Sequence, residues 1–313
     1  MFMHKGLLSK SRPIEKFFFS LFIIVVSFLI VFFIGGFLAI PLFGVNYFHN
    51  PSMLANISPE NINVLKYFQV VQTIGLFILP AFVIGFFNGD NVANYLKFNV
   101  NPKQISVILT AFVMIAAIPI INFLADINSK MVLPDCLSSF EQWMKQSEFN
   151  AQKITEAFMS TNKITGLLIN LFVIAIIPAI GEELLFRGIF QKLFISMTKN
   201  IHVGVIIAAV LFSGMHMQFY GFIPRFIMGV FLGYLLVWSK SIWLPIIAHF
   251  VNNSFAVIYY FFSNSNDMGS EIDNFGVNND TVLYLIFSVL IVSSLVFFIY
   301  KQEVSRRELG IKN

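Results

Sequence analysis

The sequence predicts an all-α polytopic membrane protein, a bundle of about eight transmembrane helices with both termini in the cytoplasm. The first observation is the composition. Of the 313 residues, 57% are hydrophobic and only 12% are charged, whereas soluble proteins carry about 25% charged residues. The second is a series of apolar runs of about 20 residues, the length that crosses a hydrocarbon core of about 30 Å. The third is the uneven distribution of Lys and Arg between alternate loops.

Each of the apolar segments predicts one transmembrane helix. The segments are residues 17–43, 67–88, 105–124, 166–195, 201–220, 222–239, 241–262 and 281–300. The first is about twice as long as the apolar core of a signal peptide, which has about 7–15 residues, so it predicts a retained helix. No internal repeat or low-complexity segment divides the chain, and residues 1–313 are expected to form a single transmembrane domain.

The basic residues orient the bundle. If the N-terminus is cytoplasmic, the inner loops and tails hold most of the Lys and Arg residues, among them Lys97, Lys103, Lys199 and Lys240. Cytoplasmic loops carry such an excess, and an even number of helices returns the chain to the same side. The mostly short loops and the richness in Phe, Ile and Asn favour a bacterial plasma membrane. Because the basic residues lie beside apolar spans, the net charge of +4 indicates contact with membrane lipid and not with nucleic acid.

The long outer loop, residues 125–163, predicts an amphipathic helix. Apolar residues recur there at helical spacing, opposite Glu141, Lys145, Gln152 and Glu156; they are Leu137, Phe140, Met144, Ala151, Ile154 and Phe158. Such a helix could gate a lateral entrance to the bundle. It could equally be a connector that rests on the membrane surface.

Glu182, Glu183 and Arg187 lie within an otherwise apolar segment. Ionisable groups inside a membrane cost a few kcal/mol each, so they mark a functional site by default. Residues four apart on a helix share a face, whereas adjacent residues diverge by about 100°. Glu183 is therefore expected to face Arg187 and Glu182 to point elsewhere, with the raised proton affinity of a general base. The alternative is a structural network in which both carboxylates pair with Arg187.

The next polar groups are His216, at the end of the fifth apolar segment, and His249 with Asn253 on the seventh. His249 and Asn253 are four residues apart, so both can donate to the same point. Turns centred near Lys199 and Lys240 place Glu182, His216 and His249 at similar depth, because each residue of a helix rises by about 1.5 Å. A single membrane histidine is more often a packing group, but similar depths make a shared site plausible.

Two prolines precede these groups by four residues, Pro178 before Glu182 and Pro245 before His249. Each removes a backbone hydrogen bond and is expected to bend its helix, which can open a cavity for water. A tolerated kink is the simpler explanation of either proline alone. Three glycines near these groups, Gly181, Gly188 and Gly214, are expected to permit close approach of neighbouring helices.

These motifs resemble those of the CAAX-processing and bacteriocin-processing membrane proteases, the CPBP or ABI family. That family is marked by E-E-x-x-x-R, F-x-x-x-H and H-x-x-x-N on separate transmembrane helices. The matching residues, in the same order, are Glu182, Glu183 and Arg187; Phe212 and His216; and His249 and Asn253. The resemblance covers about residues 165–262, which would be the catalytic core.

The resemblance implies an intramembrane endopeptidase with named roles for these residues. Glu182 and His216 would activate the attacking water, and His249 and Asn253 would stabilise the oxyanion. The remaining motif residues, Glu183, Arg187 and Phe212, would support the site.

Whether a metal takes part is open at this point. The family is often described as metalloproteases, and Glu182, His216 and His249 would be an adequate Zn²⁺ ligand set. The family's prenyl endopeptidases instead resemble metal-free, glutamate-activated enzymes, and an Asn beside His249 suits an oxyanion hole better than a metal site. The sequence has one cysteine, Cys136, and no H-E-x-x-H motif, so multi-cysteine sites and the zincin helix are excluded. The metal-free form is the favoured expectation.

The expected function is hydrolysis of peptide bonds in membrane-associated peptides or proteins, of lipidated or bacteriocin type. The alternative uses the same polar cluster without catalysis, as a membrane scaffold, a bacteriocin-immunity partner or a small-solute carrier.

Overall fold

The computed structural model describes residues 6–44, 58, 61–263 and 275–308, and within them the chain forms helices and no strand. The long elements at the two ends of the sequence are α1 (Pro13–Phe43) and α15 (Val282–Glu308). Between them lie α2 (Ile62–Thr73), η2 (Ile74–Ile78), α3 (Leu79–Asn88), α4 (Val92–Leu96), α5 (Gln104–Ala116), α6 (Ile118–Ser129), η3 (Asp135–Leu137), α7 (Ser138–Met159), α8 (Ile164–Asn170), η4 (Leu171–Ile176), α9 (Ile177–Leu185), η5 (Phe186–Phe190), α10 (Gln191–Thr198), α11 (Ile201–Met215), η6 (Phe219–Gly221), α12 (Phe222–Ser239), α13 (Trp243–Phe262) and η7 (Asn279–Thr281). The predicted all-α class is confirmed.

The helices form a polytopic bundle, as predicted. In the described part of the chain, 6 continuous helices are long and apolar enough to cross a membrane, or up to 7 if the bent pair α5–α6 is one span. That pair bends by 44°, where Pro119 in the first turn of α6 cannot donate a backbone hydrogen bond. The predicted number of eight spans and the cytoplasmic location of both termini stay predictions.

The fifth predicted segment, residues 201–220, is not helical throughout. Helix α11 ends at Met215, and its 15 residues cover only about 22 Å at 1.5 Å each. The chain then turns through Met217, whose φ is 53°, and continues as η6. His216 therefore lies at the end of a helix that is too short to cross the bilayer. Irregular backbone at such depth is tolerated where it lines a cavity.

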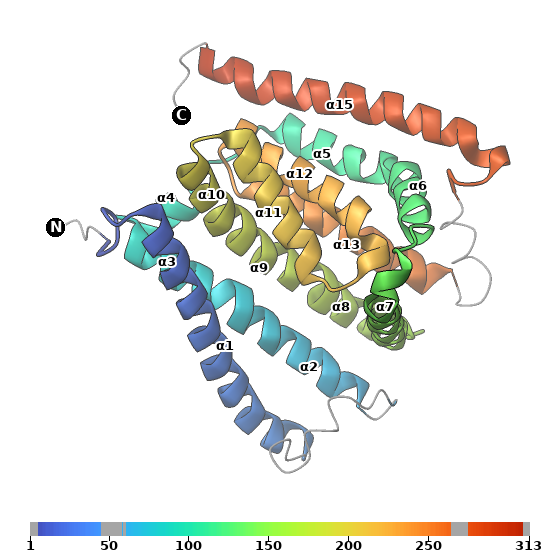
Figure 1. Ribbon diagram of the computed structural model, residues 1–313, viewed down its shortest axis with the longest axis horizontal. Coiled ribbons are helices and arrows are strands. Elements are labelled where there is room, and N and C mark those ends of the chain that lie inside the picture. Colours follow the sequence, from blue (N-terminus) through green and yellow to red (C-terminus); the bar gives the residue numbers. More distant parts are fainter. Residues whose placement is uncertain (1–5, 45–57, 59–60, 264–274, 309–313) are drawn as a thin grey trace.

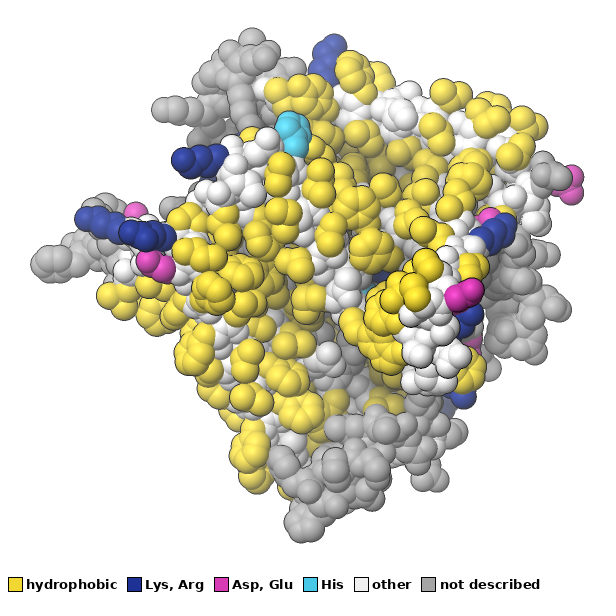
Figure 2. Space-filling model, in the orientation of Figure 1, with side chains coloured by type: hydrophobic (Ala, Val, Ile, Leu, Met, Phe, Trp, Pro, Cys, Tyr) yellow, Lys and Arg dark blue, Asp and Glu magenta, His cyan; other side chains and the backbone are white. Residues whose placement is uncertain are grey.

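The outer surface is apolar, as a lipid-facing surface requires. Figure 2 shows hydrophobic side chains over most of the described part of one face, with the charged groups towards its margins. Helices α1 and α15 run along opposite edges of the bundle (Figure 1), and only 11% of the residues in the most apolar stretch of each are buried. The interior lies between them, where one core cluster joins residues of α9 to α11 with α3 and α13.

The predicted turns are present and lie at one end of the bundle. Lys199 and Lys240 cap α10 and α12 in the left-handed conformation, with φ values of 55° and 59°. The backbone N–H of Ile242 donates to the carbonyl of Lys97 at 3.2 Å, and the N–H of Lys103 donates to Glu303 on α15 at 3.2 Å. These contacts tie the α12–α13 turn and the end of α15 to the segment between α4 and α5.

Candidate active site

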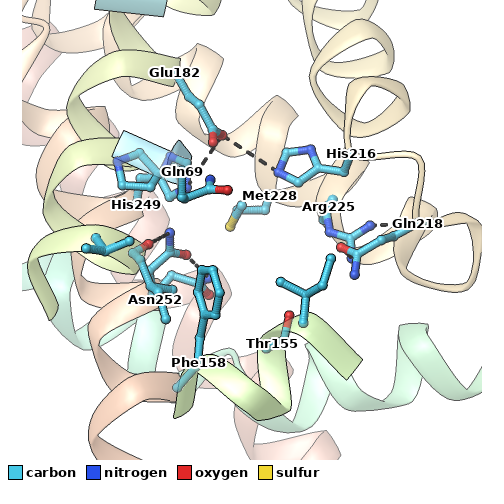
Figure 3. A pocket seen from close by; sticks show the side chains of 16 residues that line it. Gln69, Thr155, Phe158, Glu182, His216, Gln218, Arg225, Met228, His249 and Asn252 are labelled. Carbon is cyan, nitrogen blue, oxygen red and sulfur yellow. Dashed lines mark hydrogen bonds and ion pairs between the residues drawn. The ribbon is translucent and has the colours of Figure 1, made fainter. Parts of the chain in front are cut away.

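Glu182, His216 and His249 line one cavity of about 340 Å³. They come from α9, from the end of α11 and from α13, and Figure 3 shows the three side chains pointing toward one another. The similar depths had made a shared site plausible, and in the structure the three side chains lie together. Further lining residues come from α2, α7, α12 and the α11–α12 connection.

Glu183 and Arg187 form the predicted pair in the interior of the bundle. Arg187 Nη1 donates to Glu183 Oε1 at 2.9 Å, and the two residues are 1% and 0% exposed. Arg187 Nη2 also donates to the carbonyl oxygen of Gly229 on α12 at 3.1 Å. The guanidinium carbon lies 4.4 Å from the centre of the Phe212 ring. This network joins α9, η5, α11 and α12, and Glu182 has no part in the ion pair.

His249 is held by the same carboxylate. Its Nδ1 lies 2.9 Å from Glu183 Oε1, and because a carboxylate only accepts, Nδ1 carries the proton. His216 is fixed in a similar way, since its Nδ1 lies 2.8 Å from the carbonyl oxygen of Phe212. In both rings the Nε2 atom is therefore the one free to act on a bound molecule. The anchoring of His249 by Glu183 is a contact that the sequence did not predict.

Both Nε2 atoms face one oxygen of Glu182. Glu182 Oε2 lies 3.7 Å from His216 Nε2 and 4.0 Å from His249 Nε2 (Figure 3). Within the described part of the chain, no donor lies within hydrogen-bond distance of this buried oxygen. Polar atoms separated by more than about 3.5 Å are often bridged by water. The arrangement thus offers a place where a water could contact the carboxylate and His216 together.

Phe212 packs at the centre of the site, and it is fully buried. Its ring meets those of His216 and His249 edge to face, with centroid distances of 5.1 and 5.7 Å. Its other contact is the Arg187 guanidinium. One aromatic ring therefore fixes the positions of both histidines and of the arginine.

Asn253 donates a hydrogen bond to a backbone carbonyl that Pro178 leaves without its helical donor. Pro178 has no N–H, so the carbonyl of Ile174 lacks its usual helical donor. The side-chain Nδ2 of Asn253 donates to that oxygen at 3.1 Å. One of the two amide hydrogens of Asn253 is thereby used, and the other is left for the cavity or for a substrate.

Two expectations about backbone geometry are wrong. Pro245 lies in the first turn of α13, which begins at Trp243, and there it has no helical hydrogen bond to break. It does not bend a span. Gly214 approaches no neighbouring helix, since an added Cβ would meet no atom within 4 Å. The same expectation is confirmed for Gly181 and Gly188, where an added Cβ would lie 3.1 Å from Phe77 and from Leu96. In contrast, the span that carries the Glu pair contains two π-helical turns, η4 and η5, on either side of α9, and such turns are frequent at functional sites.

The predicted helix in the outer loop is present as α7, and it forms one wall of the cavity. Ile154, Thr155 and Phe158 near its C-terminal end line the cavity, and Phe158 is only 5% exposed. The helix is therefore more than a surface connector. That it gates a lateral entrance stays a prediction.

Several polar residues of the cavity were not predicted as site residues; they are Gln69, Gln218, Arg225 and Asn252. Gln69 lies in the second apolar segment and Arg225 in the sixth. Gln218 and Asn252 lie in the fifth and seventh. A systematic search for polar groups inside every apolar segment would have found all four.

The spacing of the Glu182, His216 and His249 side chains is slightly wider than that of zinc ligands. Bonds of 2.0–2.2 Å in a tetrahedral zinc site put ligand atoms about 3.4 Å apart. The separations of 3.7 and 4.0 Å between Glu182 and the two histidines are wider. Among the described residues, no three His, Cys, Asp or Glu side chains are grouped so as to hold a metal ion.

Comparisons with known proteins concern the segment that contains these motifs. Residues 164–255 match the family model for type II CAAX prenyl endopeptidase Rce1-like proteins. The membrane-embedded CAAX protease MroQ of Staphylococcus aureus (strain USA300) is 38% identical over 95 residues. That alignment covers 28% of this chain and 38% of the relative's length. No solved structure matches the chain. The resemblance to the CAAX-processing membrane proteases is confirmed, and residues 164–255 are the segment of this chain that carries it.

Proposed function

We propose that this protein is an intramembrane endopeptidase that hydrolyses peptide bonds of membrane-associated peptides or proteins. The observation that carries the proposal is the free oxygen of Glu182, which faces His216 Nε2 and His249 Nε2 at 3.7 and 4.0 Å inside a cavity. A carboxylate oxygen that faces a cavity and has no hydrogen-bond donor can accept a proton from a bound water molecule. The similarity of the motif segment to CAAX proteases supports the same reaction class.

In the proposed mechanism, a water molecule sits between Glu182 Oε2 and His216 Nε2. Glu182 takes one proton from the water while the water oxygen attacks the peptide carbonyl carbon. His216, with its proton held on Nδ1 by the carbonyl of Phe212, presents a lone pair at Nε2 that orients the water. Collapse of the tetrahedral intermediate breaks the C–N bond, and Glu182 returns its proton to the leaving amine. The products are a carboxylic acid and an amine.

The oxyanion would be stabilised by His249 and Asn253. His249 donates from Nε2 only when its ring carries both protons, because Nδ1 is bound to Glu183. In that form Nδ1 still donates to Glu183 Oε1. Asn253 contributes the amide hydrogen that its bond to Ile174 leaves unused. Removing one such donor typically lowers the rate about 100- to 1,000-fold.

The proposed mechanism uses no metal ion, because Glu182 and His216 can activate the water molecule together. Treatment of purified protein with a chelator, followed by dialysis, is expected to leave cleavage unchanged. A loss of activity that Zn²⁺ restores would replace the metal-free mechanism by a metalloprotease.

The test of the function uses full-length protein in liposomes with palmitoylated peptides as substrates. Glu182→Gln is expected to reduce cleavage by at least about 1,000-fold, the scale of a lost general base and its charge. Glu141→Gln is the matched control, since Glu141 lies on α7, pairs with Lys145 and does not line the cavity. Cleavage that survives Glu182→Gln would refute the mechanism, and no cleavage of any peptide by the wild type would refute the function.

A further inference from the structure

Arg225 is a cation in the cavity that no carboxylate of the described chain neutralises directly. It lies in the first turn of α12 and lines the same cavity as Glu182 and His216 (Figure 3). Its Nη1 donates to the carbonyl oxygen of Gln218 at 2.8 Å and its Nη2 to Gln218 Oε1 at 2.6 Å. Both acceptors are uncharged. Among the described residues, no acid forms an ion pair with it within 4.0 Å.

The contrast with Arg187 shows why Arg225 is available. Arg187 has a carboxylate partner, a carbonyl partner and a ring against its face, and it lies outside the cavity. Arg225 is half-buried, and its guanidinium carries more N–H donors than the two bonds to Gln218 use. An ionisable side chain in a membrane-spanning helix without a charged partner is a functional site by default.

The nearby acids are engaged elsewhere. Glu148 and Glu182 act on Arg225 through longer-range electrostatic attraction. However, Glu148 Oε2 accepts from the backbone N–H of Tyr220 at 3.2 Å, and Glu182 faces the two histidines. A substrate that brought its own carboxylate into the cavity would therefore supply the counter-ion that the described chain lacks at contact distance.

Gly221 holds the guanidinium in place. A Cβ built on Gly221 would lie 2.6 Å from Nη2, 2.8 Å from Cζ and 2.9 Å from Nη1 of Arg225. The guanidinium therefore occupies the place that a side chain at position 221 would take, and a larger residue there would displace it. The two bonds to Gln218 orient the guanidinium, which keeps N–H donors that Gln218 does not use. Such a pre-oriented guanidinium matches the two oxygens of a carboxylate.

We propose that Arg225 is a specificity-determining residue that binds a carboxylate of the substrate. The inference rests on the proposed function and names its substrate class, a peptide with an acidic group close to the cleaved bond. The acidic group is either the C-terminal carboxylate or the side chain of Asp or Glu, because both present the same two oxygens. Glu182 and Arg225 would then hold the reacting bond and the anionic end of one peptide in a single cavity.

The test measures binding to the full-length protein in nanodiscs, on ice, by fluorescence polarisation. The probes are palmitoylated, fluorescein-labelled dodecapeptides, each made as a free acid and as a C-terminal amide, with either Asp or Asn near the C-terminus. Mass spectrometry verifies that the probes stay intact. The wild type is expected to bind the anionic form of a pair about 10- to 100-fold more tightly than the neutral form, the scale of charge-assisted hydrogen bonds. Whichever pair shows the difference identifies the source of the carboxylate.

Two variants make the result specific. Arg225→Gln is expected to bring the ratio between anionic and neutral probes close to one, without weakening the neutral probes. Gly221→Ala displaces the guanidinium while keeping its charge, and it is expected to reduce the ratio as well. Gly214→Ala is the matched control and is expected to keep the wild-type ratio, because its new methyl group meets no atom within 4 Å.

The inference is overturned if the wild type shows no preference for either anionic probe, or if Arg225→Gln keeps that preference. Because binding is measured without turnover, the outcome is separate from that of the proposed function. Glu182-dependent cleavage without a preference for anionic probes would support the proposed function and refute the role of Arg225. A preference for anionic probes without any peptide cleavage would support the role of Arg225 and refute the proposed function.

Discussion

Substitution of one partner of the buried Glu183–Arg187 pair is expected to destabilise the protein strongly. The two side chains are 0% and 1% exposed and 2.9 Å apart. In Arg187→Met, Glu183 keeps only the contact with His249, and in Glu183→Gln the guanidinium keeps only uncharged partners, the carbonyl of Gly229 and the ring of Phe212. Removal of one partner from such a pair costs about 3–5 kcal/mol because it strands a charge. At about 2–4 °C per kcal/mol, the apparent unfolding temperature should fall by about 6–20 °C.

The double variant Glu183→Gln/Arg187→Met distinguishes two contributions to the destabilisation. One is the cost of leaving a buried charge without its partner, and the other is the cost of the lost packing. It removes both charges, keeps similar volumes and leaves an amide oxygen to accept from His249. Its destabilisation should therefore be at least about 3 kcal/mol smaller than the sum of the two single effects. Thermal unfolding in detergent, followed by the fluorescence of the three tryptophans, measures all three variants. Additive effects of the two substitutions would refute the reasoning, since they would show that the charges do not depend on each other.

Two further substitutions test the geometry of the site and of the helix packing. Asn253→Asp replaces an N–H donor by an oxygen that faces the carbonyl of Ile174, and kcat is expected to fall about 100- to 1,000-fold; a change confined to KM in steady-state cleavage assays would argue against an oxyanion role. Gly233→Ala puts a methyl group 2.8 Å from Val205 Cγ1 on α11, and overpacking should cost about 1–3 kcal/mol. Gly214→Ala meets no atom, so its unfolding temperature should stay level or rise; equal behaviour of the two glycine variants would refute the packing account.

The features that follow from helical periodicity were predictable from the sequence. The pairing of Glu183 with Arg187 required only that residues four apart share a face. The similar depth of Glu182 and His216 followed from a turn near Lys199, which is where the turn lies, but depth did not show that the two side chains face each other. The identity of the motif residues was carried by the resemblance to the CAAX-processing proteases.

The features that depend on how each helix is rotated about its own axis were not predictable. Sequence spacing did not show that His249 turns its Nδ1 to Glu183, or that Asn253 reaches the carbonyl freed by Pro178. The early end of α11 was missed because residues 201–220 are apolar enough for a full span. Arg225 was not predicted as a site residue, because only the packing of α12 against its neighbours places it in the cavity.

The central claim is that Glu182 and His216 activate a water molecule for attack on a peptide bond. Single-turnover cleavage in heavy-oxygen water tests it most directly, with mass spectrometry of the products and of the protein. The account predicts one heavy oxygen in the new carboxyl group of the product, none in the side chain of Glu182, and no labelled product with Glu182→Gln. Heavy oxygen in the Glu182 carboxylate, or cleavage products without any label, would contradict it.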